Sequence, residues 1–413
     1  MSQEYDVVIV GGGAAGIGAA RRLTELGLSP LLLEAMDRLG GRAETVRVKG
    51  HVLDLGCGWL HSGDRNAWTP IAEQAGYTVD RRDAVWGDQF RDLGFSPDEQ
   101  AAAASAFEQW ADRLADDPPV SDKASDALVR DGPWNAYISA MTGFISGVDP
   151  RCISATDYVR YDAASTGKNW RLAAGYGTLI AASLPPTVTA RTGTAVRSIE
   201  LMGNGVSITT DDGTVQARTA ILTISTAVLA KGTIQMPAGL EPWQASAAML
   251  PLGRNEKLFL EIVGDAPFVD ETHVLGNPRN ASTGGYYIRP FGAAHIECFL
   301  GGDGARVVDE GPGAAFEFAR DELANLFGTE VKRCLRPLAC SRWHGTASIG
   351  GAYSCALPGQ AEARALLARP FDDRIFFAGE ATHPFDFTTA HGAHDSGVRA
   401  ADEAFAAIAR RPS

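Results

Sequence analysis

The sequence predicts an α/β fold in which a Rossmann-like nucleotide-binding domain is interleaved with an α+β domain. Three observations favour this fold. The chain opens with a strand, a glycine-rich turn, a helix and a second strand; it closes with an apolar strand and a helix; and helix-rich and strand-rich segments alternate between these ends. A chain of 413 residues is too long for one simple core, so two domains are expected.

The N-terminal segment carries the pattern of a dinucleotide-binding site. The apolar run Val7–Val10 predicts a buried strand, and Gly11, Gly13 and Gly16 follow it with the spacing GxGxxG. An alanine-rich helix and a second apolar run then lead to Glu34. We expect Gly11 to make the tight turn, Gly13 to admit a pyrophosphate and Gly16 to let the helix pack on the strand. Glu34 is expected to bind a ribose, but this pattern alone does not separate NAD from FAD.

A second glycine-rich segment, DRLGGR, follows the second strand directly. Gly40 and Gly41 allow the backbone to approach a ligand closely, and the guanidinium groups of Arg38 and Arg42 can bind phosphate as planar forks. These residues are therefore expected to extend the nucleotide site.

The middle of the chain predicts two further groups of elements. Residues 96–117 read as a helix with Ser96 as its N-cap, and residues 194–200 and 205–225 read as antiparallel strands with an Asp-Asp-Gly turn. Strands at 257–263 and 294–300 precede a helix at 314–328. We therefore assign residues 1–79, 171–245 and 337–413 to the nucleotide-binding domain, and residues 80–170 (helical) and 246–336 (mostly strands) to a substrate domain.

Composition and charge argue against several classes of protein. The formal net charge is −13 without a basic stripe, which argues against nucleic-acid binding and is compatible with a cationic small molecule. No apolar run approaches the ~20 residues of a membrane span, and no basic leader precedes the first strand. The six cysteines are scattered without metal-ligand spacing, which favours a reduced cytoplasmic protein without a metal site. Either a monomer or a homodimer is compatible with these features.

Eight stretches resemble the flavin-containing amine oxidase family, which comprises monoamine oxidases, polyamine oxidases and flavin histone-lysine demethylases. In family order they are GGGAAG, LLLEAMDRLGGR, LDLGCGWLH, WRLAAGYGTLI, AILTISTAVLAKGTI, NEKLFLEI, RWHGTASIGGAYS and FFAGEATHPFDFTTAHGAHDSGVRAA. The segments WLH and TTAHGA are most similar to those of polyamine oxidases and histone demethylases. The resemblance implies an amine-oxidase fold with a GR2-type FAD-binding domain. It also implies FAD-dependent oxidation of an amine to an imine, with O2 as the acceptor that yields H2O2.

The same resemblance implies how the two ends of the chain hold one FAD. Glu380 would meet the ribityl chain, the backbone of Val196 would meet the adenine, and a helix beginning near Gly392 would direct its N-terminus at the flavin ring. The residues expected to bind FAD are Gly11, Gly13, Ala15, Gly16, Glu34, Ala35, Arg38, Gly40, Gly41, Arg42, Gly58, Trp59, Val196, Trp343, Gly379, Glu380, His391, Gly392 and Ala393.

Lys257 is the predicted catalytic residue. It lies in the strand NEKLFLEI, and the resemblance places a lysine at this position near flavin N5 through a water molecule. It would then assist proton handling or reoxidation by O2. The cysteine that tethers the flavin in animal monoamine oxidases is replaced by Ala352, and Cys355 is three residues out of register, so FAD is expected to be non-covalent.

The residues expected to contact the substrate are Trp59, His61, Tyr353, Phe387 and Thr389. Thr389 stands where monoamine oxidases carry the second of two facing tyrosines, and Phe387 stands where relatives carry a glycine. The substrate, a small-molecule amine, could therefore be a polyamine, a monoamine or an amino acid.

Two other functions stay open at this point. A carotenoid or protoporphyrinogen desaturase shares the fold, and a flavin-binding protein could have lost its amine site. Lys257 and the segment RWHGTASIGGAYS argue against the desaturase.

Overall fold

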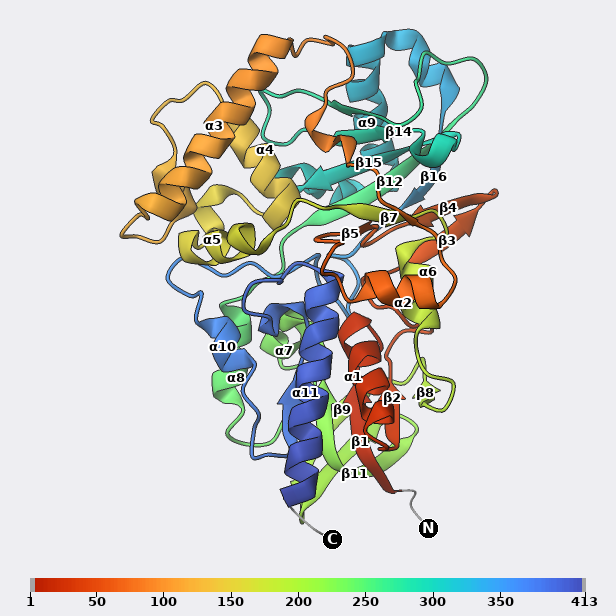
Figure 1. Ribbon diagram of the computed structural model, residues 1–413, viewed down its shortest axis with the longest axis vertical. Coiled ribbons are helices and arrows are strands. Elements are labelled where there is room, and N and C mark those ends of the chain that lie inside the picture. The colour runs from red at the N-terminus through yellow and green to blue at the C-terminus, as the bar shows by residue number, and fades with distance from the viewer. Residues whose placement is uncertain (1–3, 411–413) are drawn as a thin grey trace.

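A seven-stranded sheet forms the centre of the lower lobe in Figure 1. The structure is a computed structural model that describes residues 4–410. The strands run in the order β8-β2-β1-β11-β10-β9, with β17 also paired to β11. Their bounds are β1 Glu4–Val10, β2 Pro30–Leu33, β8 Thr189–Arg191, β9 Val196–Met202, β10 Gly205–Thr210, β11 Gly213–Leu222 and β17 Ile375–Phe377. β1, β2, β8, β11 and β17 are mutually parallel along the sheet, whereas β9 and β10 form the predicted antiparallel hairpin with β11.

Both faces of this sheet are buried at its centre, which explains why β1, β2 and β17 read as apolar runs. Val7 and Ile9 of β1 pack with α1 (Ala14–Glu25) and α11 (Ala390–Arg410) on one face. Val8 and Val10 pack on the opposite face, with α7 (Thr226–Lys231), α8 (Glu241–Ala248) and α10 (Ala363–Leu367).

Helices α1 and α11, from opposite ends of the chain, lie side by side in Figure 1. Glycines permit this contact: a Cβ at Gly18 would lie 2.7 Å from the carbonyl oxygen of His394, and one at Gly397 would lie 2.1 Å from that of Ala15. Both helices begin at the carboxyl ends of parallel strands, where ligands bind in open α/β sheets. The first and last segments of the chain therefore face the same site.

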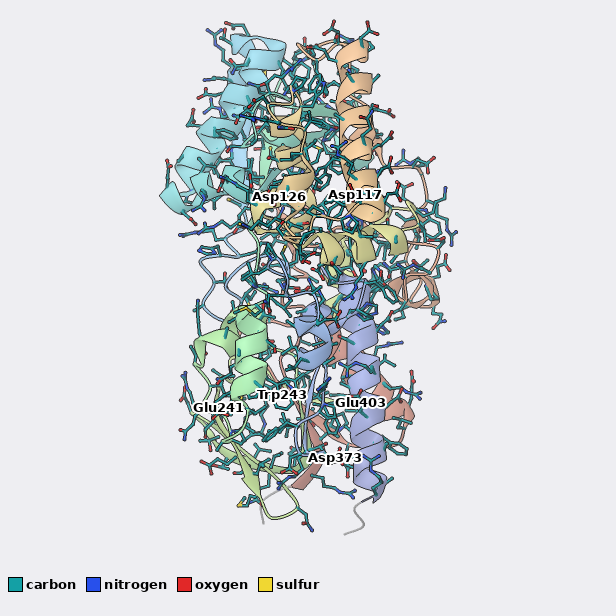
Figure 2. The ribbon with its side chains drawn as sticks, turned by 90° about the vertical axis from the view of Figure 1, so that its left-hand side faces the viewer. Asp117, Asp126, Glu241, Trp243, Asp373 and Glu403 are labelled. Atoms are coloured by element: carbon teal, nitrogen blue, oxygen red, sulfur yellow. The ribbon has the colours of Figure 1, made fainter. Side chains whose placement is uncertain are left out.

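Figure 2 shows the side of the molecule that carries α8 and α11. Trp243 of α8 packs against the rings of Phe371 and Phe377, and its indole nitrogen donates to the carbonyl oxygen of Arg369 at 2.9 Å. This contact holds α8 to the segment that leads into β17. No helix within residues 4–410 is both long and apolar enough to cross a membrane.

The upper lobe is built on an antiparallel sheet in the order β13-β14-β15-β12-β16. Its elements are β12 Asn255–Ile262, β13 Thr272–Leu275, β14 Gly285–Ile288, β15 His295–Gly301, β16 Leu335–Cys340 and α9 Pro312–Phe327, with α3 Pro97–Asp116, α4 Asn135–Ser146 and α5 Ala155–Ala164 at its side. The predicted N-cap of α3 is confirmed: Ser96 Oγ accepts from Glu99 N at 3.4 Å, and Glu99 Oε2 accepts from Ser96 N at 3.1 Å. This capping box fixes the start of the helix.

Small sheets join the two lobes. They contain β3 Thr45–Val48 with β4 His51–Asp54, and β5 Trp59–Leu60, β7 Trp170–Leu172 and β6 Val79–Asp80, flanked by α2 Trp68–Gln74 and α6 Tyr176–Ala182. The short 3-10 helices are η1 Val85–Gly87, η2 Ala124–Ala127, η3 Pro150–Cys152, η4 Pro290–Gly292, η5 Gly302–Glu310, η6 Thr329–Cys334 and η7 Glu380–Thr382. The proposed domain boundaries at 79/80 and 170/171 fall in this connecting region, and the one after residue 336 falls within β16. The five-part division stays a prediction.

Candidate active site

A cavity of about 960 Å³ runs between the lobes. It begins beside Glu34 and Val196 at the lower sheet, passes Glu380, and ends among aromatic side chains of the upper lobe. Its lining includes the expected FAD residues Gly11, Gly13, Ala15, Glu34, Ala35, Gly40, Gly41, Arg42, Gly58, Trp59, Val196, Trp343, Gly379, Glu380 and Ala393. Gly16, Arg38, His391 and Gly392 lie outside the lining.

The nucleotide end of the cavity has the backbone geometry that a pyrophosphate requires. Gly11 has φ +111°, a conformation that favours glycine, and a Cβ at Gly16 would lie 1.9 Å from the carbonyl oxygen of Gly11. Gly16 therefore acts in packing α1 against the turn and not as part of the cavity wall. No side chain caps α1 at Gly13, so the N–H groups of its first turn are free to bind an anion.

Glu34 is held rigidly at the end of β2. Its Oε2 accepts from the backbone N–H of Gly12 at 2.6 Å, and its Oε1 accepts from that of Met36 at 2.8 Å. The carboxylate thus lines the cavity beside the glycine turn, in the position where a ribose diol is expected.

Glu380 occupies the opposite side of the cavity, at the start of η7. Its Oε1 lies 3.1 Å from Arg42 Nη1, and its Oε2 accepts from Ser354 Oγ at 2.7 Å and from Thr388 N at 3.1 Å. Burial alone would raise the pKa of this carboxyl, but the charges of Arg42 and Arg364 and these hydrogen bonds lower it below its usual value. Glu380 is therefore an anion that can accept hydrogen bonds from hydroxyl groups.

Arg38 lies behind the glycine segment. It forms an ion pair with Glu44 at 2.9 Å, donates to the carbonyl oxygen of Gly41 at 2.9 Å, and its guanidinium lies 6.0 Å from the ring of Trp343. It orders the loop that carries Gly40 and Gly41.

The start of α11 is fixed by a buried network that the sequence did not reveal. The Asp386 carboxylate receives two hydrogen bonds from Arg65, at 2.5 and 2.6 Å, and lies 3.2 Å from His391 Nε2. Burial would raise the pKa of Asp386, but Arg65 and His391 together hold it well below its usual range. His391 is thus buried in this network, and no spacing in the sequence links Arg65 to Asp386.

Thr389 lines the cavity and also caps α11. Its Oγ1 accepts from the backbone N–H of Gly392 at 3.0 Å and donates to the carbonyl oxygen of Asp386 at 2.6 Å. The helix therefore begins at Ala390, two residues before the predicted start.

Lys257 is buried on β12, and its side chain lines the cavity. Its Nζ lies 2.6 Å from Glu297 Oε1 on β15, and a Cβ at Gly58 would lie 3.1 Å from the same Nζ. The strand sequence predicts apolar surroundings for Lys257, but the structure places the carboxylate of Glu297 beside its ammonium group. The ammonium makes no well-directed hydrogen bond to any described residue, which leaves its N–H groups available to a water or a ligand.

Besides Thr389, the expected substrate contacts Trp59, His61 and Tyr353 line the same cavity. Trp59 stacks on Tyr287, with ring centroids 6.1 Å apart, and meets Trp86 of η1 edge-on at 4.4 Å. His61 Nδ1 lies 2.7 Å from Asn169 Oδ1, and burial lowers the pKa of its imidazole to about 4. His61 is therefore neutral at pH 7.

Phe387 does not line the cavity. Its ring lies under the buried guanidinium of Arg364 at 3.6 Å and against Tyr161 at 5.6 Å. Its place is thus in the wall behind Tyr161.

Arg171 of β7 lies behind the cavity wall, and sequence reasoning missed it. Its guanidinium lies 4.8 Å from the ring centroids of Trp59 and Tyr287, and it forms ion pairs with Asp80 at 3.3 Å and Glu271 at 3.0 Å. The partners come from distant segments, so only the fold brings them together.

Replacing Glu34 or Glu380 by glutamine is expected to lower the flavin content more than the stability of the apoprotein. Glutamine keeps the size of the side chain but replaces one accepting oxygen with a donor that faces backbone N–H groups. The flavin-to-protein absorbance ratio and the thermal midpoint of the apoprotein measure the two effects. Glu403→Gln on the outer face of α11 is the matched control, and full occupancy in both variants would contradict the assignment.

The cavity fits FAD along its whole length. A glycine turn and an open helix N-terminus would hold the pyrophosphate, fixed carboxylates would bind the two sugar portions, and one lining contains both groups of residues. Comparison with known proteins gives the same assignment. Polyamine oxidase 4 from Oryza sativa subsp. japonica is 27% identical over 440 residues, covering 96% of this chain and 88% of that protein. Lysine-specific histone demethylase 1B from Mus musculus is 26% identical, covering 96% of this chain and 52% of that protein.

The fold is similar to that of a solved putrescine oxidase bound to putrescine. The TM-score is 0.77 at 20% sequence identity, covering 98% of this chain and 100% of that chain, which confirms the predicted amine-oxidase fold. Residues 14–404 match the family described as flavin containing amine oxidoreductase. The chain therefore belongs to the flavin-containing amine oxidoreductase family, as a flavin-dependent amine oxidoreductase whose cofactor is FAD.

Proposed function

We propose that the protein oxidises a small-molecule amine in the manner of polyamine oxidases, with O2 as the electron acceptor. The observation that carries this proposal is the pair Lys257–Glu297, which lies in the cavity wall between the FAD-binding end and the aromatic end. FAD, when bound, supplies N5 as the hydride acceptor and delivers the two electrons to O2 as H2O2.

The residues of the chain orient the amine and handle protons. As hydride leaves the carbon next to nitrogen, the nitrogen lone pair forms the C=N bond of the imine, which water then hydrolyses to an aldehyde or ketone and an amine or ammonia. Trp59 and Tyr353 bound the space in which the amine lies, and Lys257 Nζ holds a water or a proton beside the reacting atoms. Glu297 balances the charge of Lys257 and fixes its direction.

Anaerobic addition of an amine tests the proposal. The yellow flavin is expected to bleach, and admission of O2 is expected to restore it with formation of H2O2. A protein that has lost its amine site would keep its colour with every amine, and a desaturase would bleach only with an alkene-forming substrate. The test thus separates amine oxidation from the two other functions.

The rate constant for flavin reduction at low substrate concentration is expected to rise with pH between 6 and 10. A protonated amine has no lone pair to expel hydride, and amines titrate near ~10.4 unless the site shifts them. The histidines of the cavity do not titrate in this window, because burial lowers the pKa of His61 and of His273 to about 4. Stopped-flow reduction measures the profile, and a flat profile would argue against oxidation of the neutral amine.

FAD is expected to be released by acid precipitation. Ala352 has no thiol at the position of the tethering cysteine, and Cys57, a thiol in the cavity lining, has its pKa raised to about 12 by burial and so is not a nucleophile at neutral pH. Yellow flavin should appear in the supernatant. Colour retained in the protein pellet would show a covalent bond.

A further inference from the structure

The aromatic end of the cavity lies beyond Lys257 and is formed mainly by the upper lobe. Rings enter it from Trp86 on η1, Tyr137 on α4, Tyr161 on α5, Tyr287 on β14 and Phe299 on β15. Such a wall offers dispersion contact and apolar burial to a hydrocarbon or an aromatic ring.

The histidines and tyrosines of this wall are neutral at pH 7. Burial lowers the pKa of His61 and of His273 to about 4. Burial also raises the pKa of the phenols of Tyr137, Tyr161 and Tyr353 above its usual value. None of these groups therefore supplies a negative charge to a cationic substrate.

Carboxylates are scarce at this end. Four carboxylates line the cavity within residues 4–410, and two of them, Glu34 and Glu380, lie at the FAD end. Glu297 is already paired with Lys257 at 2.6 Å, and Asp162 is exposed to solvent at the rim. A second ammonium group deep in the cavity would find no free carboxylate.

Arg171 lies directly behind the wall and engages two nearby carboxylates. The residue is 7% exposed, and its guanidinium lies 4.8 Å from the ring centroids of both Trp59 and Tyr287. It forms ion pairs with Asp80 at 3.3 Å and Glu271 at 3.0 Å, so neither carboxylate is free to pair with a second ammonium group.

Resting on the amine oxidation proposed above, we propose that the substrate is an amine with a single basic nitrogen on a large apolar, preferably aromatic, body, and not a polyamine. Burying the body stabilises the complex, because apolar surface is removed from water. Burying a second ammonium without a partner is unfavourable, since the charge loses its hydration and gains no counter-ion.

Hexylamine and 1,6-diaminohexane form the decisive pair, because they share chain length and differ only in the second amine. The ratio of the flavin reduction rate constant to the substrate dissociation constant, measured by anaerobic stopped flow, is expected to be at least about tenfold higher for hexylamine, ~1.4 kcal/mol. The same ratio for a phenylalkylamine of similar length should equal or exceed that for hexylamine. The diamine has two reactive ends, so this comparison is weighted against the proposal.

The outcomes separate the two proposals. If the ratio of the flavin reduction rate constant to the dissociation constant is as high for the diamine as for hexylamine, or higher, the proposal of a single-nitrogen substrate is wrong. Amine oxidation is then unaffected. If no amine bleaches the flavin while dithionite still does, amine oxidation itself fails.

A new carboxylate in the wall provides a second test. Met141 on α4 lines the cavity and is half-buried. Met141→Glu is expected to shift the preference at least about tenfold toward the diamine, whereas Met141→Gln, of equal size and no charge, should not. An equal shift in both variants would show that shape, and not the missing charge, sets the preference.

Discussion

Replacing Lys257 by methionine is expected to slow flavin reduction, reoxidation or both by about 10²–10⁴-fold, the range typical of positioned proton-transfer groups. Methionine keeps the length and the apolar stem, so packing in β12 should be preserved. FAD should stay bound, because Lys257 lies beside Glu297 and away from the residues at the nucleotide end. Rapid-mixing measurements of both half-reactions on the flavin-loaded variant decide the outcome.

Two further variants serve as controls for the Lys257→Met result. Lys231→Met changes an exposed lysine at the end of α7 and should leave both half-reactions unaltered. Glu297→Gln keeps the shape of the partner and removes its charge, so it should slow the Lys257-assisted step while Lys257 is still present. If Lys257→Met leaves both half-reactions within about threefold of the wild type, under ~1 kcal/mol, the lysine is structural only.

Replacing Asp157 by alanine is expected to lower the free energy of unfolding by about 3–5 kcal/mol, because it leaves a buried charge without its partner. Asp157 and Arg364 are each only 2% exposed, and two hydrogen bonds of 2.7 Å join them. Arg364 also donates to Ser354 Oγ, which in turn donates to Glu380. The variant should therefore bind FAD more weakly as well as unfold more easily, as urea denaturation and flavin titration would show.

An exposed ion pair between the same two segments provides the control. Arg160 of α5 pairs with Glu362 at 2.6 Å, with side chains 42% and 77% exposed. Arg160→Ala should lower the free energy of unfolding by less than ~1 kcal/mol, since water screens the attraction between the two exposed charges. If Asp157→Ala and Arg160→Ala lower the free energy of unfolding equally, the buried pair contributes no more stability than a surface ion pair.

Local patterns in the sequence sufficed for the nucleotide-binding end of the molecule. The turn at Gly11 and the buried strands follow from preferences that act within a few residues, as does the cap at Ser96 in the upper lobe. Glu34 stands out in the sequence because it follows a strand at a characteristic distance from the glycines, and the structure places it in the cavity lining.

The aromatic end was less accessible to sequence reasoning, because its contacts join distant segments. Glu297 faces Lys257 only through the pairing of β12 with β15, and Arg171 meets Trp59 through the pairing of β7 with β5. Phe387 was expected beside the substrate from its neighbours in the chain, but the buried Arg364 covers its ring. Side-chain direction in an irregular loop depends on such tertiary partners.

The contact between α1 and α11 also sets an order of events during synthesis. Domains generally begin to fold from the N-terminus as the chain emerges, yet β17 and α11 fill places beside β11 and α1, far earlier in the chain. Until residues 375–410 have left the ribosome, part of the edge of β11 and the glycine-bearing face of α1 stay uncovered. A nascent chain therefore presents a strand edge that is open to pairing with other chains. At this stage it can bind only the adenosine portion of the cofactor. The flavin end of the site can therefore form only after residues 375–410 have been synthesised.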